Sequence, residues 1–429
     1  MTNPTSSTTD LTASSGTSAP DPIAPPADIA THATASVQSG LTAPVKRGNT
    51  TLVLGIIGVS ILVLIALGVV IYLLVGLGTD ATLLGGIMAL IPLTIVFFGV
   101  RWVDRWEPEP RLAVLFAFLW GAAVAVVIAL VIGAGVDPVI SAIAGRDDFT
   151  YEFIGAAIQA PIVEESAKGL GILIIFLAAR KYFDGPVDGI VYAAWVAGGF
   201  AFTENILYFG SQLLDSGGFD GDVFMIFFIR GIMSPFAHVM FTLCTGFAIG
   251  WAARKGYGVL GGIGFFLLGL IPAMLLHALW NGALFFVSDF FGYYFVIQFP
   301  LFIVAVLLVI FLRRQEAKLT HDRLAEYAGV GWFSPDEVGA LATGKGRRKA
   351  VSWARTQGKG PAMKRYIKDA TSLAFARQRI VTGRDRIGAE ADEAALLAQI
   401  VESRKALAGV GVAVQAPATP TTPPATPNA

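Results

Sequence analysis

Long runs of apolar residues, separated by short polar connections, fill most of the chain between residues 52 and 312. A helix needs about 20 predominantly apolar residues to cross the hydrocarbon core of a bilayer. Eight segments reach or approach this length, so the pattern predicts an all-α fold, a polytopic transmembrane helical bundle of about eight spans. The predicted spans cover residues 52–77, 82–100, 112–135, 153–179, 187–209, 224–252, 258–286 and 293–312.

The ends of the chain differ from this apolar middle, which we assign to a transmembrane domain over residues 51–312. Residues 1–50 are rich in Ser, Thr, Ala and Pro, and residues 414–429 repeat Pro, Thr and Ala, so both are predicted to be disordered tails. Residues 313–413 mix Lys, Arg, Glu, Ala and Leu in proportions typical of helix, which predicts a helical cytoplasmic appendix. No signal-peptide pattern opens the chain, so we expect the first span to be retained.

Positive charges occupy every second connection between the predicted spans. They are Lys46, Arg47, Arg101, Arg105, Arg111, Arg180, Lys181, Arg254, Lys255, Arg313 and Arg314. The remaining connections carry mostly Asp, with Arg146 as the exception. Because Lys and Arg are enriched in cytoplasmic loops of membrane proteins, both termini are predicted to lie in the cytoplasm.

Composition mainly excludes functions. The 31 basic and 31 acidic residues cancel, so nothing in the charge balance indicates nucleic-acid binding. The single cysteine, Cys244, rules out an intrachain disulfide and lies in an apolar run, where packing is its expected role.

Ionisable residues interrupt four of the apolar runs, where charge is costly and usually functional. They are Glu164, Glu165, Lys168, Glu204, His238 and His277. At 1.5 Å per helical residue, Glu164, Glu204 and His277 are expected roughly 8 to 16 Å below the outer membrane surface. His238 joins them if its helix begins near Pro235, which suits a first helical position with Ser234 as N-cap. Residues 223–233 are then expected to be interfacial or re-entrant.

The acidic pair is suited to acid–base chemistry. Glu164 and Glu165 lie four and three residues before Lys168, so all three share one helix face. Lys168 neutralises one carboxylate and leaves the other as a candidate general base. A buried Glu–Lys pair that only packs fits this spacing equally well.

The histidines suggest a metal centre. His238, His277 and Glu204 are the residue types that hold a catalytic zinc ion and leave one position for water, so we predict them as ligands of a divalent metal, with zinc expected. Asn281 lies four residues after His277, and its amide is expected to stabilise an oxyanion. Histidines that only form packing hydrogen bonds are the alternative. No H-E-x-x-H motif occurs.

Five motifs occur in a fixed order on successive spans. They are Asp104-Arg-Trp-Glu107-Pro-Glu109-Pro110, Glu164-Glu165-Ser-Ala-Lys168, Phe200-Ala-Phe-Thr-Glu204-Asn205, His238-Val-Met-Phe-Thr242 and His277-Ala-Leu-Trp-Asn281. Together they resemble the PrsW family of bacterial intramembrane proteases, over roughly residues 85–312. The family is related to the CAAX prenyl proteases, whose F-x-x-x-H motif has Glu204 in place of His here.

The resemblance implies an intramembrane peptidase of the bacterial plasma membrane that cuts near the outer half of the bilayer. Its implied partners are the lipid bilayer and a membrane-anchored protein substrate such as an anti-sigma factor, which it cuts first. In the wider superfamily both a metal centre and Glu-activated water are considered, and both stay open here.

Two other classes compete with a peptidase. A proton- or cation-coupled transporter would use the same buried groups as a relay, but such transporters usually contain paired repeats and none is visible in the sequence. A catalytically inactive scaffold that presents the appendix to a partner is the third possibility.

Overall fold

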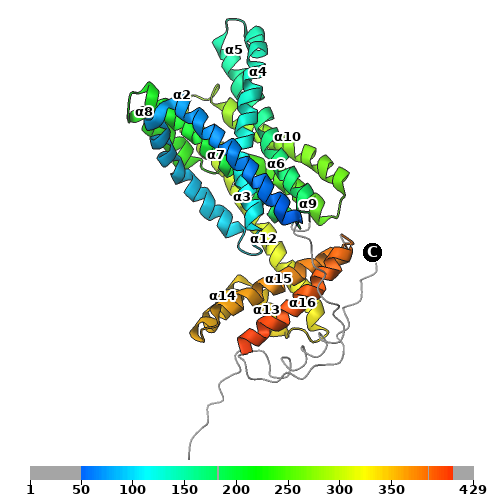
Figure 1. Cartoon of the computed structure of the whole chain (residues 1–429). Coiled ribbons are helices and arrows are strands. Elements are labelled where there is room, and N and C mark those ends of the chain that lie inside the picture. The colour runs from blue at the N-terminus through cyan, green and yellow to red at the C-terminus, as the bar shows by residue number, and fades with distance from the viewer. Residues whose placement is uncertain (1–49, 181–182, 385, 409–429) are drawn as a thin grey trace, which may run out of the picture.

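The computed structural model describes residues 50–180, 183–384 and 386–408. Within these ranges every regular element is helical and no β-strand occurs, so the predicted all-α fold is confirmed (Figure 1). The disordered tails predicted for residues 1–50 and 414–429 lie outside the described residues, except for residue 50.

Helix α2 (Thr50–Val103) contains the first two predicted spans. The helix is interrupted at Gly78, whose φ of 75° and ψ of 169° suit only glycine. Thr82 Oγ1 donates to the carbonyl of Leu73, nine residues earlier, at 3.1 Å. The chain therefore folds back at Gly78, and α2 forms two arms (Figure 1).

The remaining helices of the bundle follow in short steps. They are α3 (Arg111–Leu119), α4 (Val126–Ala144), α5 (Asp148–Phe153), α6 (Ala160–Ala178), α7 (Pro186–Asp215), α8 (Gly221–Phe227), α9 (Ala237–Arg254), α10 (Val259–Ala283), α11 (Phe290–Tyr293) and α12 (Phe299–Ala328). Single π-helical turns join some of them: η1 (Trp120–Ala125), η2 (Ile154–Gln159), η3 (Phe228–Met233) and η4 (Tyr294–Gln298). Such π-turns often mark functional sites.

Six helical stretches among the described residues are long and apolar enough to cross a membrane. The first, Gly55–Val103, supplies two spans because it folds back at Gly78. The stretch from α5 through α6 is of similar length but carries the charges of Glu164, Glu165 and Lys168. With it the bundle has about eight membrane-length helices, as predicted, and the chain is a multi-pass membrane protein.

Helices α7 and α9 touch backbone to backbone. A Cβ atom added to Gly189 would lie 2.0 Å from the carbonyl oxygen of Gly246, and one added to Gly246 would lie 2.2 Å from that of Gly189. Only glycine allows this approach, which is how helices pack closely in lipid. The contact brings the helices of Glu204 and His238 together.

The sixth predicted span breaks where Pro235 indicated. Helix η3 ends at Met233 and α9 begins at Ala237. The N-cap role predicted for Ser234 is wrong, because its hydroxyl donates back to the carbonyl of Ile229 at 2.6 Å. The hydroxyl thereby satisfies a carbonyl at the end of the preceding helix instead of an amide of the next.

The appendix is a small helical unit below the bundle (Figure 1). Helix α12 enters it without interruption, so the boundary predicted at residue 313 falls inside a helix. The unit continues through α13 (Pro335–Leu341), α14 (Gly344–Thr356), α15 (Gly360–Val381) and α16 (Arg386–Ala408). It has its own core, which includes Leu324, Tyr327, Phe333, Leu373 and Ile400.

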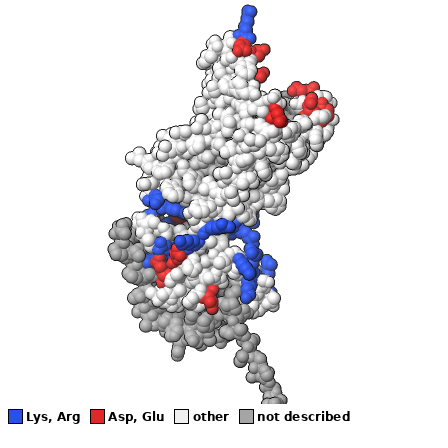
Figure 2. Space-filling view, turned by 180° about the vertical axis from the view of Figure 1, so that it is seen from behind, with Lys and Arg blue, Asp and Glu red and all other residues white. Residues whose placement is uncertain are grey.

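Charges are segregated along the molecule. Figure 2 shows Asp and Glu side chains at the end far from the appendix, and a belt of Lys and Arg where the bundle meets the appendix. This is the distribution expected if the appendix lies on the cytoplasmic side. Cytoplasmic termini stay a prediction.

Candidate active site

Six ionisable side chains from four helices meet in one buried cluster inside the bundle, which we call the membrane cluster. Helix α6 supplies three of them, and α7, α9 and α10 supply one each: Glu164, Glu165, Lys168, Glu204, His238 and His277. The side chains of Glu165 and Lys168 are 0% exposed. These are the six residues that were identified in the sequence because an ionisable side chain inside an apolar span is energetically costly.

Lys168 lies at the centre of the membrane cluster. Its Nζ atom is 3.1 Å from Oε2 of Glu164 and 2.9 Å from Oε1 of Glu165. The same atom is 3.0 Å from Nδ1 of His238 and 4.0 Å from the centroid of the Phe200 ring. The ammonium group therefore compensates the buried carboxylates, as charge at membrane depth requires.

Each histidine is held by a carboxylate. His238 Nε2 lies 2.8 Å from Oε2 of Glu204, and His277 Nδ1 lies 3.2 Å from Oε1 of Glu165. An ionised carboxylate only accepts hydrogen bonds, and a neutral imidazole has one N–H. The carboxylates therefore fix the tautomers and leave a lone pair on Nδ1 of His238 and on Nε2 of His277, the latter 3.9 Å from Oε2 of Glu164.

These two nitrogen atoms and a carboxylate form a group that could hold a metal ion. One ligand atom from each of Glu164, His238 and His277 lies within 4.8 Å of the others. Two imidazoles and a carboxylate match the donors of a catalytic zinc site, and such imidazoles commonly donate their second N–H to a carboxylate. The donor set fits a divalent metal, but an ion there requires the Lys168 ammonium to move, since it contacts two of the three donors.

Glu204 differs from the arrangement predicted from sequence. Its Oε2 atom pairs with the guanidinium of Arg230 as well as with His238, so Glu164 takes its place in the donor group. Arg230 also donates from Nε to Oδ1 of Asn205 at 2.9 Å. Sequence reasoning assigned Arg230 no role; the available signal was a charged side chain in an apolar stretch, four residues before the break at Ser234.

A cavity of about 340 Å³ opens beside the membrane cluster. Its wall is formed by α4, η2, α6 and α7, and both Glu164 and Glu204 line it. The wall also includes Gln159, Phe200 and Tyr208. A small polar molecule such as water, or a peptide group, can therefore reach these two carboxylates, whereas Glu165 is sealed off.

Of two further residues from the sequence motifs, Thr242 bonds to the membrane cluster and Asn281 does not. Thr242 Oγ1 donates to Oε2 of Glu165 at 2.8 Å, so Glu165 is held from three sides by Thr242, Lys168 and His277. Asn281 does not join the described cluster, because its Nδ2 atom donates to the carbonyl of Ala156 at 2.9 Å.

The fold and site define a multi-pass helical membrane protein with a buried carboxylate–imidazole centre that could hold a metal. Residues 109–306, which carry this entire centre, match the family model described as PrsW family intramembrane metalloprotease. The resemblance read from the five motifs is thereby confirmed.

Relatives named Protease PrsW also match the chain. The protein of Clostridioides difficile is 32% identical over 163 residues, which cover 38% of this chain and 63% of that protein. The protein of Geobacillus kaustophilus is 29% identical over 152 residues, 35% of this chain and 58% of that protein. The protein of Shouchella clausii is 26% identical over 234 residues, 54% of this chain and 97% of that protein. No solved structure matches the chain.

Proposed function

We propose that this protein is an intramembrane peptidase that hydrolyses a peptide bond of a membrane-anchored protein. One observation carries the proposal: donor atoms of Glu164, His238 and His277 gather beside a cavity of about 340 Å³ inside a membrane bundle. The chain spans less than two thirds of the length of the relatives from Clostridioides difficile and Geobacillus kaustophilus. Their name, Protease PrsW, therefore supports this proposal without establishing the activity.

The geometry favours a division of labour among the carboxylates. Glu165 and Glu204 each accept the N–H of one histidine and orient it, and neither is free to act alone. Glu164, which lines the cavity and lies 3.9 Å from Nε2 of His277, is the proposed working carboxylate. The ammonium group of Lys168 lies 3.1 Å from it and compensates its charge.

We propose that a divalent metal, with zinc expected, is held by Glu164, Nδ1 of His238 and Nε2 of His277. When bound, such an ion lowers the pKa of its water toward neutrality and supplies a nucleophile. Without an ion, Lys168 remains the central cation and Glu164 acts as the general base. The oxyanion role of Asn281 stays a prediction, since its amide is bound to Ala156 in this structure.

The substrate follows from the setting of the site. A centre enclosed by membrane helices meets peptide bonds of proteins that are themselves embedded in or anchored to the bilayer. A single-span anti-sigma factor, cut near the outer half of the bilayer, is the candidate that the family resemblance implies.

The test is co-expression of the full chain with a panel of tagged single-span membrane proteins that includes anti-sigma factors, followed by immunoblotting. We expect cleavage of at least one panel member and a loss of about 100-fold or more in Glu164→Gln. Glu402→Gln, at a side chain 64% exposed in the appendix, is the control and should cleave normally. Undiminished cleavage by Glu164→Gln, or no cleavage by the wild-type protein, would remove the proposal.

A further inference from the structure

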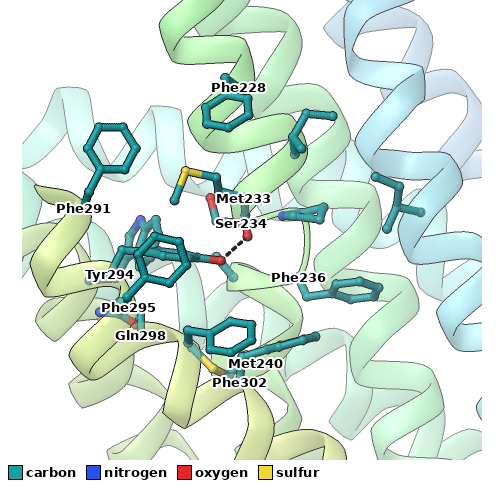
Figure 3. Close-up of a pocket in the computed structure, with 16 residues that line it drawn as sticks. Phe228, Met233, Ser234, Phe236, Met240, Phe291, Tyr294, Phe295, Gln298 and Phe302 are labelled. Carbon is teal, nitrogen blue, oxygen red and sulfur yellow. Dashed lines mark hydrogen bonds between the residues drawn. The ribbon is translucent and has the colours of Figure 1, made fainter.

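A second, larger cavity of about 590 Å³ lies between η3, α9, α10 and the η4–α12 stretch (Figure 3). Its inner wall is almost entirely apolar and includes Phe228, Phe236, Met240, Trp280, Tyr294 and Phe302. Phe291, Phe295 and Phe299 line it as well and are 44%, 59% and 42% exposed. We call this cavity the aromatic groove, and its exposed aromatic side chains turn it toward lipid.

The aromatic groove shares two helices with the membrane cluster. Ala237 and Met240 line the groove on α9 and flank His238 along the helix. Trp280 lines it on α10, three residues and thus about one turn after His277. A chain lying in the groove is therefore in contact with the same helix turns that hold the two imidazoles.

One polar side chain in the aromatic groove has an unused acceptor. Gln298 is only 2% exposed and lines the groove (Figure 3). Its Nε2 atom donates to the hydroxyl of Tyr293. That hydroxyl gives its single hydrogen to the carbonyl of Leu279 at 3.0 Å, so it can only accept from Gln298. Oε1 of Gln298 has no hydrogen-bond partner among the described residues, and leaving it unpaired costs free energy.

The unused acceptor distinguishes the possible occupants. A lipid acyl chain has no hydrogen-bond donor, and an intact transmembrane helix uses its N–H groups internally. A locally unwound peptide has free N–H groups in need of acceptors, and its side chains suit an apolar aromatic wall.

We propose that the aromatic groove binds a short, unwound, apolar stretch of the substrate's membrane segment, with Oε1 of Gln298 accepting a backbone N–H from it. This inference rests on the proposed function, because it treats the groove as a substrate subsite. Gln298 acts as a positioning residue, and the groove directs the adjoining peptide bond toward His238 and His277.

The test measures binding apart from cleavage. The photoreactive residue benzoylphenylalanine replaces Phe295 in full-length Glu164→Gln protein, reconstituted in phosphatidylcholine–phosphatidylglycerol vesicles. The probes are two synthetic single-span Leu/Ala peptides, one interrupted by Gly-Pro-Gly and one uninterrupted. The same photoreactive residue at Leu64, an apolar position 69% exposed on α2, is the matched control.

We expect the interrupted peptide to crosslink about tenfold more at position 295 than at position 64. At position 295 it should also crosslink more than the uninterrupted peptide does. Gln298→Met should lower that yield about tenfold, the worth of one hydrogen bond of about 1.4 kcal/mol. Equal yields at positions 295 and 64 would overturn the inference even if Gln298→Met fails to fold. Crosslinks to lipid that the peptide cannot displace would also overturn it and assign the groove to lipid.

Failure of the two proposals is distinguishable in these experiments. Absence of cleavage by the wild-type protein, with selective crosslinking at position 295, removes the peptidase and leaves a peptide-binding groove. Cleavage without selective crosslinking removes only the groove as a substrate subsite.

Discussion

Two clusters of buried charge lie at different levels of the molecule and differ in composition. The membrane cluster combines glutamates with a lysine and two histidines beside a cavity. The second, which we call the interface cluster, lies where the bundle meets the appendix. Carboxylates of two bundle loops gather there with arginines of the appendix: Asp104, Glu107, Glu109, Asp184, Arg347, Arg379 and Arg384.

The contacts of the interface cluster join distant parts of the chain. Arg384 Nη1 lies 3.2 Å from Oδ1 of Asp184, 200 residues away in sequence. Arg347 donates from Nη1 to the carbonyl of Trp106 at 3.0 Å, and its guanidinium lies 3.4 Å from the centroid of the Trp106 ring. Glu109 accepts the hydroxyl hydrogen of Tyr192 at 2.5 Å. The contacts of Arg384 and Arg347 fix the appendix to the bundle, whereas the bond between Glu109 and Tyr192 lies within the bundle.

Burial shifts the pKa values of several residues in the interface cluster. Burial raises the pKa of Asp184 to about 7 against the pull of Arg384 and Arg379. Burial, followed by the charge of Asp184, raises the pKa of Glu107 well above its ordinary range. Burial also lowers the pKa of Arg347 to about 9, which still leaves this side chain charged at neutral pH.

The comparison shows that buried charge alone does not mark a catalytic centre. In the interface cluster the cations are arginines, which do not exchange protons near neutral pH and which suit fixed, planar contacts. In the membrane cluster the partners are imidazoles that each keep one ring nitrogen away from the carboxylate that orients them, and two carboxylates open onto a cavity. We therefore assign chemistry to the membrane cluster and attachment to the interface cluster.

The largest expected difference between the clusters is in cleavage. His277→Ala removes an imidazole that Glu165 orients, and we expect a loss of 100-fold or more in processing of a panel substrate. Arg384→Ala, in the interface cluster, should retain cleavage within a fewfold. Quantitative immunoblots of both variants at equal protein levels measure this, and equal losses would erase the distinction between the two clusters.

A smaller effect is expected at Glu204. In Glu204→Gln the amide no longer offers His238 a charged acceptor, and such changes near a metal ligand typically weaken metal affinity 10- to 100-fold. Competition with a fluorescent zinc chelator measures the change. Asp184→Asn is the matched control, since it makes an equivalent replacement in the interface cluster, and its zinc affinity should equal that of the wild-type protein.

The smallest effect is a pH dependence of the interface. Asp184 has a pKa of about 7 in the folded protein against an ordinary 3.8, so folding takes up a proton. Its contribution to stability is therefore complete below about pH 4 and is lost as pH rises through 7. Hydrogen-exchange protection of residues 104–110, corrected for intrinsic rates, should fall about tenfold between pH 6 and 8.

Asp184→Asn supplies the control for that experiment because an amide does not titrate. Its protection should change less over the same pH interval. If the wild-type and Asp184→Asn profiles coincide, Asp184 does not control the interface.

Much of the membrane cluster was predictable because charge in lipid is costly. The apolar runs gave the spans, and every ionisable residue inside them had to find a partner, so Glu164, Lys168, Glu204, His238 and His277 were expected to meet. The break at Pro235 followed from its missing N–H. These inferences depend only on the local sequence and on the lipid environment that the apolar runs indicate.

The details that the sequence did not reveal depend on helix rotation and on distant segments. Spacing placed Asn281 on the face of His277, yet its amide reaches the backbone of η2. Arg230 reaches Glu204 from a stretch whose depth the sequence did not fix. Glu107 and Asp184 lie in polar loops that resemble surface, and only the docking of the appendix buries them.

Metal content of the purified protein tests the assignment of chemistry to the membrane cluster most directly. Elemental analysis should be made on the full-length protein, on His238→Ala and His277→Ala, and on Arg384→Ala as the interface control. We expect about one divalent metal ion per chain in the wild-type protein and in Arg384→Ala, and far less in the two histidine variants. A wild-type protein that cleaves its substrate without metal, or histidine variants that keep the full metal content, would contradict the assignment of Glu164, His238 and His277 as a metal centre.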